Sequence, residues 1–220
     1  MAKIVWDAQG EHFYETGVDH GILFVYDPQT KTYGKGVPWN GLTAVNESPS
    51  GAESNPQYAD NIKYLDLTSA ETFGATIEAF YYPDEFAECD GTKEIKPGIK
   101  IGQQARKMFA FAYRTKLGND TVGNAYGYKL HIIYGAKAAP SENSHSTIND
   151  SPEASTFSWE VSTTPVAVKG AEPTSHISID STKSDATLLQ KIIDALEGTE
   201  LEDSHLLLPD DIADLDAQGR

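Results

Sequence analysis

Alternation of apolar and polar residues dominates the first four-fifths of the chain, and this feature most limits what the chain can fold into. Residues that alternate in this way place their side chains on opposite faces of a β-strand, one face toward a core and the other toward water. Eight segments have this pattern or are apolar runs of strand length: 22–26, 42–46, 61–67, 75–82, 108–117, 126–136, 156–163 and 175–180. We therefore expect a mainly β protein, an antiparallel β-sandwich or partial barrel of about eight strands.

Two segments predict helices. Residues 84–90 are acidic at their start and are followed by glycine, which is typical of a short helical turn. Residues 184–197 begin with the capping pair Ser184-Asp185 and carry apolar residues at helical spacing before Gly198. We expect one short helical turn in the middle of the chain and one C-terminal helix.

The last part of the chain is strongly acidic but contains an apolar cluster. Between Asp194 and Arg220 there are nine acidic residues and one basic residue. Because a solvated tail has no use for adjacent leucines, we expect this arm to dock either on the protein's own body or on a neighbouring molecule. The residues that would dock are Leu206, Leu207, Leu208, Ile212 and Leu215. The chain thus divides into a β domain over residues 1–183 and a C-terminal helix with an acidic arm over residues 184–220.

Residues that could carry chemistry are scattered along the sequence. The six histidines show no HExxH motif and no other paired spacing, so we expect sheet or surface histidines and no metal site. They are His12, His20, His131, His145, His176 and His205. Cys89 lies in the acidic segment 84–90, where neighbouring carboxylates disfavour its thiolate, and we expect it to be buried. The acids of this segment fit the start of a helix better than a calcium site. The sequence has no GxSxG motif and no P-loop, so we expect neither an enzyme nor a cofactor.

The formal net charge of −16, from 33 acidic and 17 basic residues, excludes one class of nucleic-acid binding. Clamping DNA or RNA through its phosphates requires Lys and Arg to replace counterions. Residues 1–15 carry charges where a signal peptide has an apolar core, and no run approaches the ~18 apolar residues of a membrane span. A single cysteine cannot form an internal disulfide. We expect a soluble protein made inside the cell.

The longest interruption of the strand pattern is the loop at residues 46–60, which consists of small and polar residues with two prolines. It offers no nucleophile, base or ligand cluster. A second protrusion, at residues 118–123, is rich in Gly and Asn and predicts the tip of a hairpin. Protrusions without chemistry usually contact a neighbouring molecule, so the pattern favours a structural protein over an enzyme.

The residues around this loop resemble those of a known family. Val45-Asn46-Glu47-Ser48, a small polar loop and then Tyr58-Ala59-Asp60-Asn61 are similar to a stretch in the major tail (tail tube) proteins of long-tailed, non-contractile bacteriophages. The similarity continues in ATIEAF (75–80), PDEF (83–86), NDSPEA (149–154) and FSWEVSTT (157–164). Together these motifs extend over most of residues 1–180, and their specificity lies in their order and spacing.

The resemblance implies a β-sandwich or partial barrel flanked by a helix, which self-assembles as homo-hexameric rings. The rings stack into a hollow tube, and viral DNA passes through the lumen without specific binding during ejection. The implied partners are further copies of the chain and other tail proteins: the tape measure protein, the tail terminator and the baseplate or tip. The implied location is the virion tail, assembled in the cytoplasm of the bacterial host.

For the loop at residues 46–60, the resemblance implies an assembly arm that is flexible in the monomer and ordered by a neighbouring subunit. Tyr58 would anchor the return of the loop, and Asp60 and Asn61 would fix its turn. The interface residues implied are Asn46, Glu47, Ser48, Pro49, Glu53, Pro56, Tyr58, Asp60 and Asn61.

Two other classes of function are consistent with the residues. A carbohydrate-binding β-sandwich, such as an adhesive or receptor-binding module, would present tryptophans to solvent, and the chain has Trp6, Trp39 and Trp159. An enzyme with a carboxylate pair on the sheet would use two of the 33 acids, although nothing singles out a pair. A different virion protein that assembles head to tail is a further alternative.

Overall fold

The computed structural model describes residues 4–148, 150 and 153–217. Within these residues there are fourteen strands, one short 3-10 helix and two α-helices. The strands are β1 (Phe13–Asp27), β2 (Thr32–Trp39), β3 (Leu42–Glu47), β4 (Ser54–Ala59), β5 (Ile62–Thr68), β6 (Gly74–Ala79), β7 (Lys93–Lys96), β8 (Ile99–Ile101), β9 (Phe109–Asn119), β10 (Gly123–Ala138), β11 (Phe157–Thr163), β12 (Val166–Val168), β13 (Ala171–Thr174) and β14 (His176–Asp180). The helices are η1 (Asp84–Glu88), α1 (Ala186–Glu197) and α2 (Pro209–Ala217). Asn149, Ser151 and Pro152 of the NDSPEA motif lie outside the described residues.

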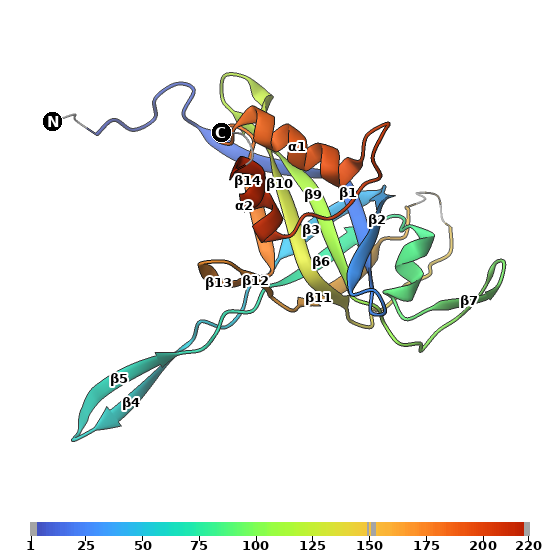
Figure 1. The fold of residues 1–220 in the computed structure, drawn as a ribbon, viewed down its shortest axis with the longest axis horizontal. Coiled ribbons are helices and arrows are strands. Elements are labelled where there is room, and N and C mark those ends of the chain that lie inside the picture. The colour runs from blue at the N-terminus through green and yellow to red at the C-terminus, as the bar shows by residue number, and fades with distance from the viewer. Residues whose placement is uncertain (1–3, 149, 151–152, 218–220) are drawn as a thin grey trace.

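One antiparallel sheet of eight strands forms the body of the molecule (Figure 1). Its order is β2-β1-β9-β10-β11-β6-β3, and β14 also pairs with β10. In the described residues the sheet stays open, with β2 and β3 at its two ends. The expected mainly β, antiparallel fold is therefore confirmed, as is the hairpin formed by β9 and β10.

Alternation along the central strands buries both faces of this sheet. In β9, Phe109, Phe111 and Tyr113 point into one core. This inner core also contains Trp39, Ile77, Phe86 and Trp159, so the curved sheet packs on itself. The alternate residues Ala110 and Ala112 face a second core on the outer side of the sheet.

The two helices cover the second core. Asp185 caps α1, because its side chain accepts hydrogen bonds from the backbone N–H groups of Thr187 and Leu188. Ile192 and Leu196 of α1 are buried against the outer face of the sheet. The helix α2 is additional to the one C-terminal helix expected, and it forms where Pro209, Asp210 and Asp211 open a short amphipathic turn with Ile212 and Leu215. Among the described residues, neither helix has the length and apolar character needed to cross a bilayer.

Seven of the eight expected segments lie in the eight-stranded main sheet, and one does not. Residues 32–39 are not among the expected segments, but they form the edge strand β2, in which Pro38 pairs with Ile22. An edge strand tolerates proline because one side of it makes no ladder hydrogen bonds. Residues 61–67 were expected in the sheet, and they form β5 of a separate two-stranded hairpin with β4. Two further small hairpins, β7–β8 and β12–β13, also lie outside the main sheet.

Candidate functional site

The hairpin of β4 and β5 projects from the body of the molecule (Figure 1). We call residues 48–73 the arm. Its base is held by Ser50 and Thr72, whose backbones exchange hydrogen bonds of 2.8 and 2.7 Å. At its tip Ala59 pairs with Ile62, so Asp60 and Asn61 form a two-residue turn, and both have positive φ (50° and 66°). This is the backbone of a tight hairpin turn, for which Asp and Asn are favoured residues.

Residues 46–60 do not form the one continuous loop that the sequence predicted, because they include the end of β3 and all of β4. Asn46 and Glu47 belong to β3, where they pair with Thr76 and Ala75 of β6. Ser48, Pro49 and Glu53 lie in the stalk of the arm, and Pro56 lies in β4. The sequence resembled a loop because proline and small residues have low strand propensity, and pairing with β5 overrides that preference.

The arm carries apolar side chains that the chain itself leaves uncovered. Every residue of β4 and β5 is exposed. Its large apolar residues are 40 to 70% exposed: Tyr58, Ile62, Tyr64, Leu65 and Leu67. Tyr58 is thus not buried within one chain.

Strand pairing shows that these apolar residues occupy both faces of the hairpin. Gln57 pairs with Leu65, and Asn55 pairs with Leu67, so these two leucines share one face. The register shifts by one residue at Tyr64, so Ile62, which pairs with Ala59, lies on this face as well, whereas Tyr58, adjacent to Gln57, lies on the other. A two-stranded hairpin is only marginally stable alone, and this one has an apolar surface on either side. The arrangement suits insertion between other molecules.

Two further segments expose apolar residues. At the N-terminal end of the described chain, Ile4, Val5 and Trp6 are at least 68% exposed. The β7–β8 hairpin exposes Ile95 and Ile99. Together with the arm, these segments extend from different parts of the body (Figure 1).

In the acidic segment at the C-terminal end of the chain, the five apolar residues expected to dock lie on the protein's own body. Leu207 is buried in the second core, and its carbonyl accepts a hydrogen bond of 2.9 Å from the Tyr134 hydroxyl. Leu206, Ile212 and Leu215 pack against the same core. Leu208 is the most exposed of the five, at 40%. The contact expected from the sequence thus forms within one chain.

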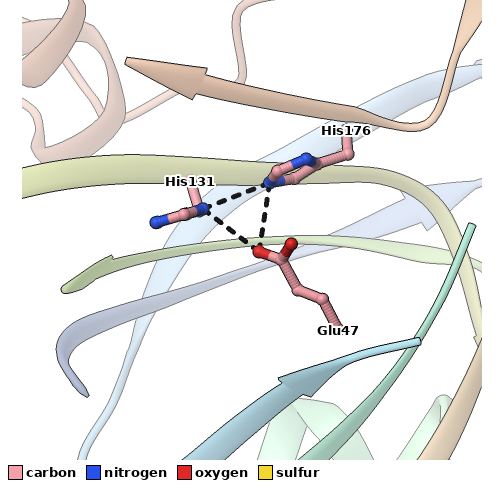
Figure 2. A group of neighbouring side chains, drawn as sticks. All are labelled: Glu47, His131 and His176. Carbon is pink, nitrogen blue, oxygen red and sulfur yellow. Dashed lines mark hydrogen bonds and ion pairs between the residues drawn. The ribbon is translucent and has the colours of Figure 1, made fainter. Parts of the chain in front are cut away.

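The structure also brings together three ionisable residues that are distant in the sequence: Glu47, His131 and His176 (Figure 2). We call them the Glu-His-His cluster. Nδ1 of His131 lies 3.2 Å from Nε2 of His176. Oε1 of Glu47 lies 3.2 Å from Nδ1 of His131 and 3.4 Å from Nε2 of His176. Figure 2 shows the three groups converging from different strands on one point.

Sheet register explains why these residues meet. His131 in β10 is directly opposite Tyr113 in β9, and Ile133, two residues later, is opposite His176 in β14. Residues two apart on a strand share a face, so both histidines point the same way. Glu47 ends β3 and reaches them from the far end of the curved sheet.

An aromatic column holds the two imidazole rings. His131 stacks on Tyr113 with ring centroids 4.7 Å apart and an interplanar angle of 7°. His176 stacks on His131 at 5.4 Å and on Phe73 at 4.8 Å. Tyr113 also donates a hydrogen bond of 2.6 Å to Oε1 of Glu47.

A second set of hydrogen bonds fixes the far side of the His131 ring. Its Nε2 lies 3.1 Å from Oγ1 of Thr115 and 3.5 Å from Oε1 of Glu15. Glu15 in turn accepts hydrogen bonds from Thr115 and Lys129, each of 2.5 Å. Burial alone would raise the pKa of Glu15, but these hydrogen bonds lower it.

Burial lowers the pKa of both histidines in the cluster below the ordinary 6.5, although the nearby Glu47 carboxylate acts in the opposite direction. The burial of Tyr113 and its hydrogen bond to Glu47 raise the pKa of that phenol. Both imidazoles are thus neutral near pH 7, with one ring nitrogen each available as a lone-pair donor.

Sequence reasoning treated the histidines as isolated and missed this cluster. His131 and His176 are 45 residues apart, and their meeting depends on a strand register that local pattern does not reveal. The other residues considered for chemistry have structural partners. Cys89 is fully buried, as expected. In the segment 84–90, Asp84 pairs with Lys100, and Asp90 pairs with Arg106.

Comparison with known proteins identifies no family. No family model matches the chain. No curated protein matches it either. Among solved structures, the chain is similar to one described as "Cryo-EM Structure of an Extracellular Contractile Injection System, PVC sheath-tube complex in extended state". The TM-score is 0.32 at 15% identity, and the match covers 73% of this chain and 88% of the other.

Proposed function

We propose that this protein is the tail tube (major tail) protein of a long-tailed, non-contractile bacteriophage, a structural subunit without catalytic activity. The observation that carries the proposal is the arm, an ordered hairpin with exposed apolar residues on both faces. A chain that functions alone would gain nothing from displaying this surface, whereas a neighbouring copy can cover it. The residues of the family resemblance flank this arm, at 45–48 and 75–80.

In the proposed assembly, six copies form a ring and rings stack into a tube. The open sheet supports this geometry, because its end strands β2 and β3 leave edges that strands of adjacent copies can join. Contacts within a ring close by rotation, whereas contacts between rings repeat head to tail and build a filament. The arm supplies the contact to the next ring.

The charge of the chain suits a conduit for DNA. With a net charge of −16, the subunits would present carboxylates to the lumen, and DNA would pass without being held. The proposed location is the virion tail, assembled in the host cytoplasm. The proposed partners beyond the chain itself are the tape measure, terminator and baseplate or tip proteins.

The carbohydrate-binding alternative receives no support from the tryptophans. Trp39 and Trp159 are buried in the inner core, where their rings pack 5.5 Å apart, and cannot stack on a sugar. Trp6 is exposed, but one tryptophan near the chain end does not make a binding platform. We therefore propose a single function.

The test is electron microscopy and sedimentation of the purified protein over a range of concentrations. The intact chain should form hollow tubes or six-fold rings. A variant with Tyr58→Ser, Tyr64→Ser and Leu67→Ser should stay monomeric at concentrations where the parent assembles, because the apolar contact is lost. A control with Asn55→Ser, Gln57→Ser and Thr68→Ser alters polar residues of the same hairpin and should assemble like the parent.

Each result has a defined meaning. Tubes from all three proteins would keep the proposed function and refute the role of the arm. Monomers from all three, at every concentration and salt, would refute the proposed function.

A further inference from the structure

We propose that Glu47, His131 and His176 form a binding site for a divalent transition-metal ion of the zinc class, at the root of the arm. Imidazole nitrogen and carboxylate oxygen are the ligands with which such ions are bound in proteins. The site would use Oε1 of Glu47, Nδ1 of His131 and Nε2 of His176. This proposal does not depend on the proposed function.

The spacing of the three ligand atoms is the first argument. The distances between them are 3.2, 3.2 and 3.4 Å. Around a tetrahedral zinc ion with bonds of about 2.0–2.1 Å, neighbouring ligand atoms lie about 3.3–3.4 Å apart. The three atoms therefore have the spacing of three corners of a zinc tetrahedron, and the fourth corner would be left for water.

The surrounding hydrogen bonds are the second argument, because they prepare each ligand. Thr115 and Glu15 face Nε2 of His131, which favours the proton on that nitrogen and leaves the lone pair of Nδ1 toward the ion. A carboxylate behind a ligating imidazole is a common arrangement at zinc sites. Tyr113 occupies one lone pair of Glu47 Oε1, and a carboxylate oxygen has a second for the ion.

Ring orientation is fixed as well. His131 lies between Tyr113 and His176 in the aromatic column, and Phe73 covers the other face of His176. Both ligand rings are thus held in place without an ion, so little ordering would oppose binding.

The site is accessible to an ion from solvent. The side chain of Glu47 is 33% exposed. His176 also lines a cavity of about 310 Å³ together with Glu71, Thr174 and Ser175. Within the described part of the chain, the buried Oγ of Ser175 has no hydrogen-bond partner, which is consistent with polar occupants such as water in this cavity.

An ion at this position would join the arm to the centre of the sheet. Glu47 is the last residue of β3, directly before the arm, and Phe73 is the last residue of the arm. His131 and His176 belong to β10 and β14. The ion would therefore link the entry strand of the arm to two strands of the body and limit motion of the arm about its root.

The test is metal binding to the untagged, EDTA-treated protein. Co²⁺ should give the intense visible absorption of a tetrahedral site, with one ion bound per chain, and Zn²⁺ should abolish that absorption by displacement. Glu47→Gln and His176→Gln keep side-chain size while weakening or removing a ligand, and each should weaken Zn²⁺ binding at least about 100-fold in isothermal titration. Thr115→Val, which alters only the support of His131, should weaken it about 10-fold.

His12→Gln and His205→Gln are the matched controls, because both histidines are exposed and lie outside the cluster. Both should bind Co²⁺ and Zn²⁺ like the parent. The proposal is overturned if the folded parent shows no saturable binding, or if Glu47→Gln and His176→Gln bind as tightly as the controls. Tube formation is measured separately, so failure of the metal site leaves the proposed function standing, and the reverse also holds.

Discussion

Cys89 lies in the inner core with no exposed surface, directly after the short helix η1. Burial raises the pKa of its thiol from 9.0 to about 12, and the carboxylates of Glu88 and Asp90 act in the same direction. A thiol in this state is neither a nucleophile nor a metal ligand at neutral pH. At the level of single residues, burial lowers the pKa of His131 and His176 and raises the pKa of Cys89, because in each case it favours the neutral form.

This shift predicts how stability depends on pH. The unfolded chain releases the Cys89 proton above pH 9.0, whereas the folded chain holds it until about pH 12. The contribution of the Cys89 thiol to the free energy of unfolding is therefore fully present below pH 9.0 and is lost as pH rises toward 12. At one pH unit above the pKa of the thiol in the unfolded chain, ionisation of Cys89 should lower the free energy of unfolding by about 1.4 kcal/mol.

The measurement is denaturant unfolding at pH 8 and pH 10 for the parent and for Cys89→Ala. The variant should be less stable at pH 8, because it removes a buried side chain, but should lose less stability between the two pH values. An equal pH-dependent loss in both proteins would contradict the assignment. Alkylation offers a second check, since the thiol should react at pH 8 only after unfolding.

At the level of elements, sequence pattern predicted strands whose two faces differ and missed the edge strand β2. Residues 108–117 correspond to β9 because large and small residues alternate between two cores. β2 was missed because it contains Gly34, Gly36 and Pro38, which normally interrupt strands. A Cβ atom at Gly36 would lie 2.9 Å from the side chains of both Ile22 and Phe24, so glycine is required there by close packing.

The candidate site could be predicted only in part, for a related reason. Tyr58 and the Asp60-Asn61 turn stood out locally, and the structure places them in the arm. The Glu-His-His cluster depends on which residues of β10 face β9 and β14, and that register is fixed by the whole sheet. Local patterns hold no information on such pairs, because their members are separated by long stretches of sequence.

A bulge in β10 provides a prediction at this scale. The pairing of β10 with β9 shifts between Ile133 and Ala136, and Gly135 within the shift has a φ of +59°. A Cβ atom at Gly135 would lie 2.1 Å from the carbonyl oxygen of Thr164. Gly135→Ala should therefore cost about 2–5 kcal/mol of unfolding free energy, from the left-handed backbone and the backbone clash together.

Gly98→Ala is the matched control, because Gly98 also has a positive φ (+77°) but no atom within 4 Å of its Cβ position. Gly98→Ala should lower the free energy of unfolding by only about 1–2 kcal/mol, because only the left-handed backbone conformation opposes the new side chain. Thermal and denaturant unfolding measure both variants. Equal losses for the two would show that the contact with Thr164 is relieved by a small movement and that the bulge is not rigid.

At the level of the whole molecule, charge and exposed apolar surface act against each other. Each copy carries a net charge of −16, which repels other copies, while the arm and the N-terminal segment expose apolar side chains that favour contact. Repulsion between copies is long-ranged at low salt and is screened within about 10 Å at 0.1 M. Apolar contact is short-ranged and little affected by moderate salt.

Under the proposed function, this balance predicts that salt accelerates assembly. Raising ionic strength from 0.01 to 0.1 M shortens the screening length from about 30 to about 10 Å, so like-charged subunits should approach more often. We expect the initial rate of tube growth, followed by light scattering, to rise roughly 10-fold or more over this range, as for other electrostatically controlled associations. The polar-substitution control of the arm should follow the same curve. A rate that falls with salt would show that complementary charges drive assembly, and the apolar arm would then not be the main contact between subunits.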